Sequence, residues 1–127
     1  MKLTLQSILN FPEFFPLTTT TRLPIKTAYK LSRLATVVEQ EINFYRSKLR
    51  EILAEYCQKD EEGNYIPTAD GQGFRIIEGK EAECRKTMEE LDTLEVELPD
   101  IMFDIEEFEG LELKISELNG IMPFIKE

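Results

Sequence analysis

The sequence predicts an α+β fold, and three patterns along its 127 residues support this prediction. A heptad of apolar residues, sustained over four repeats, predicts one long helix in the first half of the chain. An Asp-Gly pair between two apolar arms predicts a β-hairpin near the middle. A later alternation of apolar and acidic residues predicts a strand. The expected fold is a single domain, residues 1–127, with a long helix, a β-hairpin, an antiparallel second helix, and then a C-terminal strand and short helix.

The long helix is predicted over residues 23–58. Pro24 suits its first turn. Proline lacks the backbone N–H, and an N–H in the first turn would have no partner within the helix. Apolar residues then recur at alternating steps of three and four, and we call this set the seam. A seam this regular requires a second helix against it, from the same chain or from another copy, and so predicts an interaction surface. The seam comprises Ala28, Leu31, Ala35, Val38, Ile42, Tyr45, Leu49, Ile52 and Tyr56.

The segment 64–77 contains two glycines and an aspartate, which raises the question of a ligand loop. In an EF-hand loop starting at Asp60, Tyr65 would occupy the position that needs glycine. Gly71 would occupy the position of the bidentate glutamate, so calcium is not expected. A phosphate-binding loop would need a Gly-Lys-Ser/Thr ending, which the segment lacks. We therefore predict no metal and no cofactor here.

The same segment fits a β-hairpin. Asp70-Gly71 is a preferred pair for a two-residue type I′ turn, in which both residues need a positive φ. Pairing outward from this turn places Pro67 opposite Phe74 and Ile66 opposite Arg75, followed by Tyr65 opposite Ile76 and Asn64 opposite Ile77. Proline lacks an N–H and so restricts its arm to an edge. The residues predicted to define the hairpin are Tyr65, Pro67, Asp70, Gly71, Phe74 and Ile76.

Two cysteines, Cys57 and Cys84, are equally distant from the predicted turn. If the two helices run antiparallel, their sulfurs become near neighbours. One interpretation is a redox-sensitive clasp. The other is a pair of reduced, semi-buried thiols inside a cellular protein.

The remaining segments complete the expected architecture. A second helix is predicted over residues 79–94, and a strand ending at Pro99 opens the segment 95–127. Ser116 is the expected N-cap of a last short helix. Residues 1–22 are predicted to form a short helix capped by Thr4, followed by an irregular Pro/Thr segment.

Composition excludes several classes of function. The chain has no histidine and two cysteines, so it has no imidazole base and no four-cysteine zinc site. Nothing marks one of its many carboxylates as a tuned acid or base, and we predict no catalytic residue and no enzymatic activity.

The net charge of −10 is unevenly distributed, with +5 in residues 1–50 and −15 in residues 51–127. Overall acidity argues against direct nucleic-acid binding, which depends on neutralising phosphates. Lys26, Lys30 and Arg33 could contact nucleic acid, but a charged edge beside the seam is the favoured interpretation.

No apolar run approaches the roughly 18 residues of a membrane-spanning helix, and the N-terminal segment lacks the features of a signal peptide. We therefore expect a cytoplasmic protein with no membrane partner.

Three segments together resemble a family of small bacteriophage and prophage proteins of unknown function. They are "RLPIKTAYKLSRL", "KDEEGNYI" and "EVELPDI", followed by the endings around Glu109–Leu113 and Ser116–Ile125. The resemblance covers residues 23–127. It implies a phage origin, a location in the host cytoplasm or the virion, and no catalytic residues to transfer.

The leading functional hypothesis is a non-enzymatic interaction or assembly protein that self-associates through the seam. Its partners would be itself and another phage or host protein. The alternative is an acidic charge mimic that binds and blocks a basic host nuclease or DNA-binding protein.

Overall fold

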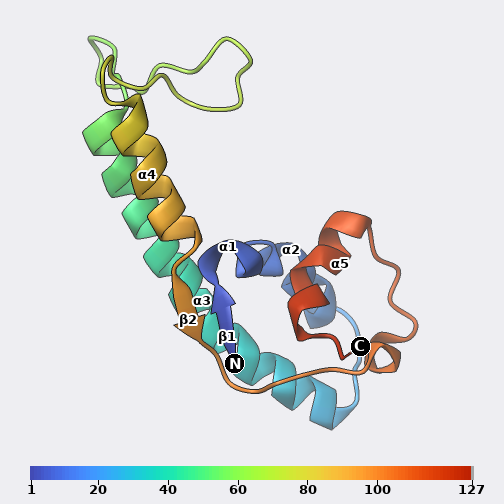
Figure 1. Cartoon of the computed structure of the whole chain (residues 1–127). Coiled ribbons are helices and arrows are strands. Elements are labelled where there is room, and N and C mark those ends of the chain that lie inside the picture. The colour runs from blue at the N-terminus through green and yellow to red at the C-terminus, as the bar shows by residue number, and fades with distance from the viewer. Residues whose placement is uncertain (127) are drawn as a thin grey trace. The chain divides into compact units, whose positions relative to one another are not determined.

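The computed structural model describes residues 1–126, which form a mixed α+β fold (Figure 1). The chain divides into two compact units: unit 1 contains residues 1–43 and the chain from Leu94 onward, and unit 2 contains residues 44–93. In chain order the elements are β1 (Lys2–Thr4), α1 (Leu5–Ile8), α2 (Phe11–Thr19), α3 (Ile25–Tyr56), α4 (Glu81–Asp92), β2 (Glu95–Glu97), the 3₁₀ turn η1 (Ile105–Phe108), α5 (Ile115–Ile121) and the 3₁₀ turn η2 (Met122–Phe124).

The long helix is confirmed, with slightly narrower bounds than 23–58. α3 runs from Ile25 to Tyr56, and the carbonyl of Pro24 accepts the N–H of Ala28 at 2.9 Å. Pro24 therefore stands just before the helix rather than inside it. After Tyr56 the chain becomes extended, because Cys57 forms an antiparallel bridge with Ile76.

The predicted strand is also confirmed. β2 pairs antiparallel with β1, and Leu3 lies opposite Val96. Leu5 N donates to Leu94 O, and Leu98 N donates to Met1 O, which extends the ladder beyond both ends. The partner strand β1 was not predicted. Its signal is the short alternation of polar and apolar residues in "KLTL" immediately before the helix that Thr4 caps.

The irregular segment predicted within residues 1–22 is only partly confirmed, because the chain is helical through Thr19 and irregular from Thr20 to Pro24. α2 contains Pro16, Thr18 and Thr19, and it ends only at Thr19. The hydroxyls of Thr18 and Thr19 donate to the carbonyls of Phe15 and Pro16 at 2.6 and 2.7 Å. These bonds tie each threonine side chain back to the preceding turn, so both residues are accommodated inside the helix instead of preventing it.

The core of unit 1 is rich in phenylalanine. Phe14 meets Phe108 edge to face at 5.3 Å between ring centroids, and Phe11 meets Phe124 at 6.2 Å. α5 packs closely on α2 at Gly120. A Cβ atom at Gly120 would lie 2.9 Å from Phe14 Cβ, so only glycine fits there without movement of α2 or α5.

Unit 2 consists of the second half of α3, the returning helix α4 and the chain between them. Figure 1 shows α4 beside α3, and two side-chain contacts fix their antiparallel register. Tyr45 Oη donates to Asp92 Oδ1 at 2.7 Å, and Tyr56 Oη lies 3.4 Å from Thr87 Oγ1.

The predicted second helix, 79–94, is too long at both ends. Gly79 has a φ of +88°, which a helical residue cannot adopt, and α4 begins at Glu81. At the other end the carbonyl of Leu94 already belongs to the sheet of unit 1, where it accepts the N–H of Leu5.

The connection between α3 and α4 contains the predicted hairpin pairing near its tip. Pro67 lies opposite Phe74 in an antiparallel bridge, and Arg75 N donates to Ile66 O at 2.8 Å. This part of the predicted register is confirmed.

Farther from the tip the predicted register is wrong. Tyr65 bridges Lys59 instead of Ile76, and Ile76 bridges Cys57. The residues that follow α3 insert between the two arms: Ile66 N donates to Gln58 O, and Gln58 N donates to Arg75 O. A third extended segment supplies more backbone partners than a hairpin of two arms could.

The turn also differs from the predicted type I′. Gly71 has a φ of +71°, but no non-glycine residue of the described chain has a positive φ, so Asp70 does not meet the type I′ requirement. Gly71 N donates to Thr68 O, and Thr68 N donates to Gly73 O. The loop is therefore four residues long, Ala69–Gln72, with glycine at its left-handed position.

The last helix begins before the predicted cap. α5 starts at Ile115, which places Ser116 inside the first turn and Lys114 at the N-cap. The carboxylate of Glu117 accepts the N–H of Lys114 at 2.7 Å. This bond satisfies the backbone at the start of the helix, a role that the sequence prediction assigned to the serine hydroxyl.

Candidate interaction surfaces

The seam is largely covered by the chain itself. Leu49 is half-buried and Ala28 is exposed, whereas the other seam side chains are buried. Apart from Leu31, which lines a hollow described below, a second copy could reach the buried ones only if the fold opened. An intermolecular contact of the folded protein must therefore use other side chains. The buried members are Leu31, Ala35, Val38, Ile42, Tyr45, Ile52 and Tyr56.

One partly buried polar network ties α3 to η1 within unit 1. Thr27 Oγ1 donates to one oxygen of Glu107 at 2.9 Å, and Lys30 Nζ donates to the other at 3.1 Å. Lys30 also donates to Met102 O at 2.7 Å and lies 4.5 Å from the centroid of the Phe103 ring. Lys30, one of the three basic residues singled out in the sequence, therefore has an internal role.

The surroundings of Glu107 keep it charged. Burial alone would raise the pKa of Glu107, but hydrogen bonds from Asp104 N, Thr27 and Lys30 lower it below its usual value of 4.5. Both oxygens of the carboxylate accept hydrogen bonds from groups of the same unit, so we assign it a structural role.

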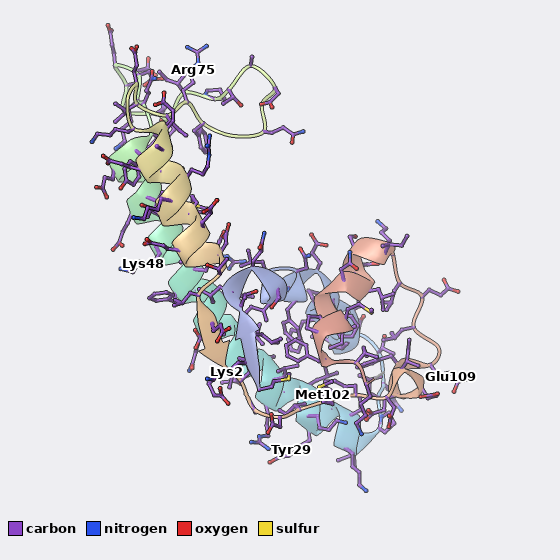
Figure 2. The ribbon with its side chains drawn as sticks, in the orientation of Figure 1. Lys2, Tyr29, Lys48, Arg75, Met102 and Glu109 are labelled. Atoms are coloured by element: carbon purple, nitrogen blue, oxygen red, sulfur yellow. The ribbon has the colours of Figure 1, made fainter. Side chains whose placement is uncertain are left out.

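The start of α3 carries exposed apolar side chains among basic ones. Ile25 is 88% exposed and Tyr29 is 62% exposed. Tyr29 projects from α3 in Figure 2, and the guanidinium of Arg33 lies 5.8 Å from the centre of its ring. Residues 14–38 include no acidic residue. We call the set Arg22, Ile25, Lys26, Tyr29 and Arg33 the basic face.

A shallow hollow adjoins the basic face. It lies between the end of α2 and the start of α3, and its volume is about 160 Å³. Its apolar lining includes Phe15, Leu23 and Leu31, together with Ala28, the exposed seam residue. The lining also includes Thr18, Thr19 and Thr21. Apolar side chains of a partner would find cover here, with cations beside them.

A segment of opposite charge follows Phe103 in the same unit. Residues 104–115 carry exposed carboxylates at Asp104, Glu106, Glu109 and Glu112. Ile105 is 57% exposed and Ile115 is 80% exposed. Figure 2 labels Glu109 on the loop that follows η1. We call residues 104–115 the acidic segment, and it combines charge with large apolar side chains, as the basic face does.

The predicted hairpin residues form a small cluster of their own. The rings of Tyr65 and Phe74 lie 5.5 Å apart, with Pro67 opposite Phe74, and Lys59 Nζ lies 5.1 Å from the Tyr65 ring. Ile76 is half-buried beside Cys57.

Asp70 and Gly71 organise the turn. Hydrogen bonds from the Thr68 hydroxyl and from Gln72 N lower the pKa of the Asp70 carboxyl. The Asp70 carboxylate therefore stabilises the loop conformation, as expected if the segment is a turn.

Among residues 1–126 no group of three or more cysteine or acidic side chains is arranged to hold a metal ion. Within the same residues no helix has the length and apolar character needed to cross a bilayer.

Comparison with protein-family models, with curated proteins and with solved structures gives no match for this chain. The resemblance to small phage proteins therefore stays a prediction.

The basic face and the acidic segment were not identified as a pair from the sequence. The signals were present as the +5 and −15 halves and as the acid-free stretch of residues 14–38. The sequence does not show which charged side chains are already paired inside the fold. Lys30, for example, is paired with Glu107.

Proposed function

We propose that the protein is a non-enzymatic interaction protein that associates with copies of itself, and that the contact joins the basic face of one copy to the acidic segment of the next. The observation that carries the proposal is the presence, on one unit, of two oppositely charged surfaces that each expose large apolar side chains. Charge complementarity selects and orients partners, and apolar contact provides the affinity.

The apolar residues on these surfaces support a docking role. Ile25 and Ile115 are the most exposed large apolar side chains of the described residues. Burial of an isoleucine side chain on association is worth about 1.5–3 kcal/mol. An isoleucine of the acidic segment would find an apolar wall in the hollow next to Ala28 and Leu23.

A contact between two different surfaces is heterologous, so each copy keeps one free surface of each kind. Such contacts build closed rings or open filaments, depending on the rotation between copies. An assembly role in a phage particle, the context that the resemblance implies, would use repeating contacts of this kind.

The test is a charge exchange. Variant A carries Lys26→Glu and Arg33→Glu on the basic face, and variant B carries Glu106→Lys and Glu109→Lys on the acidic segment. We expect the unaltered chain to associate at micromolar concentration in low salt and to dissociate as salt screens the charges. Each variant alone should lose at least about tenfold in affinity, which corresponds to about 1.4 kcal/mol. A mixture of A and B should associate again, because each altered surface then meets its complement.

A matched control changes the same charges elsewhere. Arg85→Glu with Lys86→Glu on α4 gives the same change in net charge as variant A at exposed positions outside both surfaces. Sedimentation velocity should show this variant associating like the unaltered chain. A chain that stays monomeric at all concentrations, or a mixture of A and B that stays monomeric, would refute the proposed contact.

The charge-mimic alternative has one observation in its favour. The only ion pair that the described residues give to the exposed carboxylates of the acidic segment is a 4.0 Å contact between Asp104 and Lys126. The acidic segment is therefore available to a basic partner of another kind. In that case variant B would lose capture of a basic host protein at low salt, whereas variant A would keep it.

A further inference from the structure

Cys57 and Cys84 are the two cysteines of the chain, and both lie in unit 2 at the same end of the helix pair. Cys57 directly follows α3, and Cys84 lies in the first turn of α4. Both are free thiols, and each residue is 7% exposed. The 26 residues between them include the whole connection from α3 to α4.

A series of three backbone hydrogen bonds joins the two positions. Ile77 N donates to Tyr56 O at 2.7 Å, Lys80 N donates to Ile77 O at 3.0 Å, and Cys84 N donates to Lys80 O at 3.0 Å. Cys57 itself bridges Ile76. The start of α4 is therefore held against the end of α3 at the level of the two cysteines.

Side-chain contacts give the same register. Tyr56 immediately precedes Cys57, and its hydroxyl lies 3.4 Å from Thr87 Oγ1. Thr87 is three residues after Cys84, so the two side chains share a face of α4. Burial raises the pKa of both thiols, and the Cys84 sulfur raises the pKa of Cys57 further.

We propose that Cys57 and Cys84 are a dithiol modification site, which a small-molecule disulfide such as oxidised glutathione converts to an intrachain disulfide. The Cys84 thiolate attacks one glutathione sulfur, forms a mixed disulfide and releases one glutathione thiolate, which takes up the proton. The Cys57 thiolate then attacks the Cys84 sulfur and releases the second glutathione. Two electrons pass from the protein sulfurs to glutathione, and two reduced glutathiones leave.

The bond would clasp the two helix ends from which residues 58–80 emerge. A disulfide across this span removes conformational freedom from the unfolded chain and so stabilises the folded one. The raised pKa values and the burial of both thiols slow attack in the native state at neutral pH. The disulfide therefore forms while the chain folds, or when unit 2 opens.

The experiment measures the thiol–disulfide equilibrium of the full chain in glutathione buffers. The reduced, unfolded protein is refolded in each buffer, so that both thiols meet the oxidant before they become buried. The reaction is then quenched in acid, and intact mass distinguishes the intrachain disulfide, lighter by two hydrogens, from glutathione adducts. A parallel series stays in denaturant. We expect the equilibrium constant for the intrachain disulfide to be about a hundredfold larger in the folded chain. The oxidised chain should melt about 5–10 °C above the reduced one.

A displaced dithiol provides the control. The variant Cys57→Ala with Gln58→Cys closes a loop one residue shorter, from a side chain that leaves the backbone in another direction. Its folded and denatured equilibrium constants should be nearly equal. If the unaltered chain also gives a ratio near or below one, or if it accumulates glutathione adducts or crosslinked dimers instead, the proposal is overturned.

Discussion

The half of α3 in unit 1 and the half in unit 2 continue the same heptad seam, yet the two units enclose it differently. In unit 1 the core gathers phenylalanines from α2, η1, η2 and the chain before η1, and at Gly120 two helices meet closely. In unit 2 the hydroxyls of Tyr45 and Tyr56 bond to one returning helix, and the buried side chains are fewer and include no phenylalanine.

This difference shows that a heptad pattern predicts which side chains are covered without predicting what covers them. A core of aromatic rings depends on volume, because every added or removed atom changes the contacts of its neighbours. A helix pair closed by tyrosine hydroxyls depends more on individual hydrogen bonds, each with a modest net effect. The two units should therefore respond differently to substitution.

The largest effect is expected for Gly120→Ala in unit 1. The added methyl would lie 2.9 Å from Phe14 Cβ and 3.0 Å from the backbone carbon of Asn10, so α5 must move away from α2. We expect a loss of about 3 kcal/mol in the free energy of unfolding, measured by urea denaturation. Gly73→Ala in unit 2 is the control, because a Cβ there has open space within 4 Å. Equal losses at the two glycines would remove the distinction between the units.

An intermediate effect is expected for Glu107→Gln, which tests the polar network of unit 1. Loss of the charged acceptor for Thr27 and Lys30 should lower the free energy of unfolding by about 2 kcal/mol at neutral pH. The folded pKa of Glu107 lies below 4.5, so its contribution is present above pH 4.5 and is lost as the pH falls through the folded pKa.

The stability difference between the unaltered chain and Glu107→Gln should accordingly shrink on acidification. Glu106→Gln, an exposed neighbour, should show neither the loss nor its pH dependence. A difference that stays constant down to acidic pH would contradict the assigned cause.

The smallest effect is expected for Tyr45→Phe in unit 2, which removes the hydroxyl that donates to Asp92. The loss should be about 1 kcal/mol, because the net value of one such hydrogen bond is modest. Tyr29→Phe, at an exposed ring of unit 1, is the matched control and should be near neutral.

Titration gives a second measurement at Tyr45. Burial first, and then the hydrogen bond and negative charge of Asp92, raise its pKa to about 12. Its contribution to stability is therefore complete below pH 10 and is lost as the pH rises from 10 toward 12. Ultraviolet titration should show one tyrosine ionising late. In Asp92→Asn its pKa should fall without returning to 10, because burial remains.

The sequence predicted those elements whose pattern is local. The seam indicated α3, the alternation before Pro99 indicated β2, and the Asp-Gly pair indicated a turn that Gly71 does occupy. Each pattern depends on the spacing of residues that are close in sequence, so it can be recognised without knowledge of distant contacts.

The sequence-based predictions were wrong where the structure depends on hydrogen-bond partners that are distant in sequence, or on local side-chain hydrogen bonds that the patterns do not reveal. The chain after α3 inserts between the hairpin arms and changes the partners of Tyr65 and Ile76. The β-branched side chains of the threonine tract favour extended backbone, whereas Thr18 and Thr19 lie inside α2 with their hydroxyls bonded to the preceding turn. The proposed interaction surfaces could not be predicted from the sequence for a related reason. A charged side chain is available to a partner only if the fold has not already paired it, and the sequence does not show which charges are paired.

The three backbone hydrogen bonds from Tyr56 to Cys84 also separate the tip of the α3–α4 connection from its base. Changes near Asp70–Gln72 need not reach the helix pair, because Tyr56, Ile77 and Lys80 hold the base closed. Exposed loop tips of this kind accept inserted sequence well. An epitope or fluorophore-binding peptide placed between Gly71 and Gln72 would give a reporter version of the protein in which both of the proposed contact surfaces are left intact.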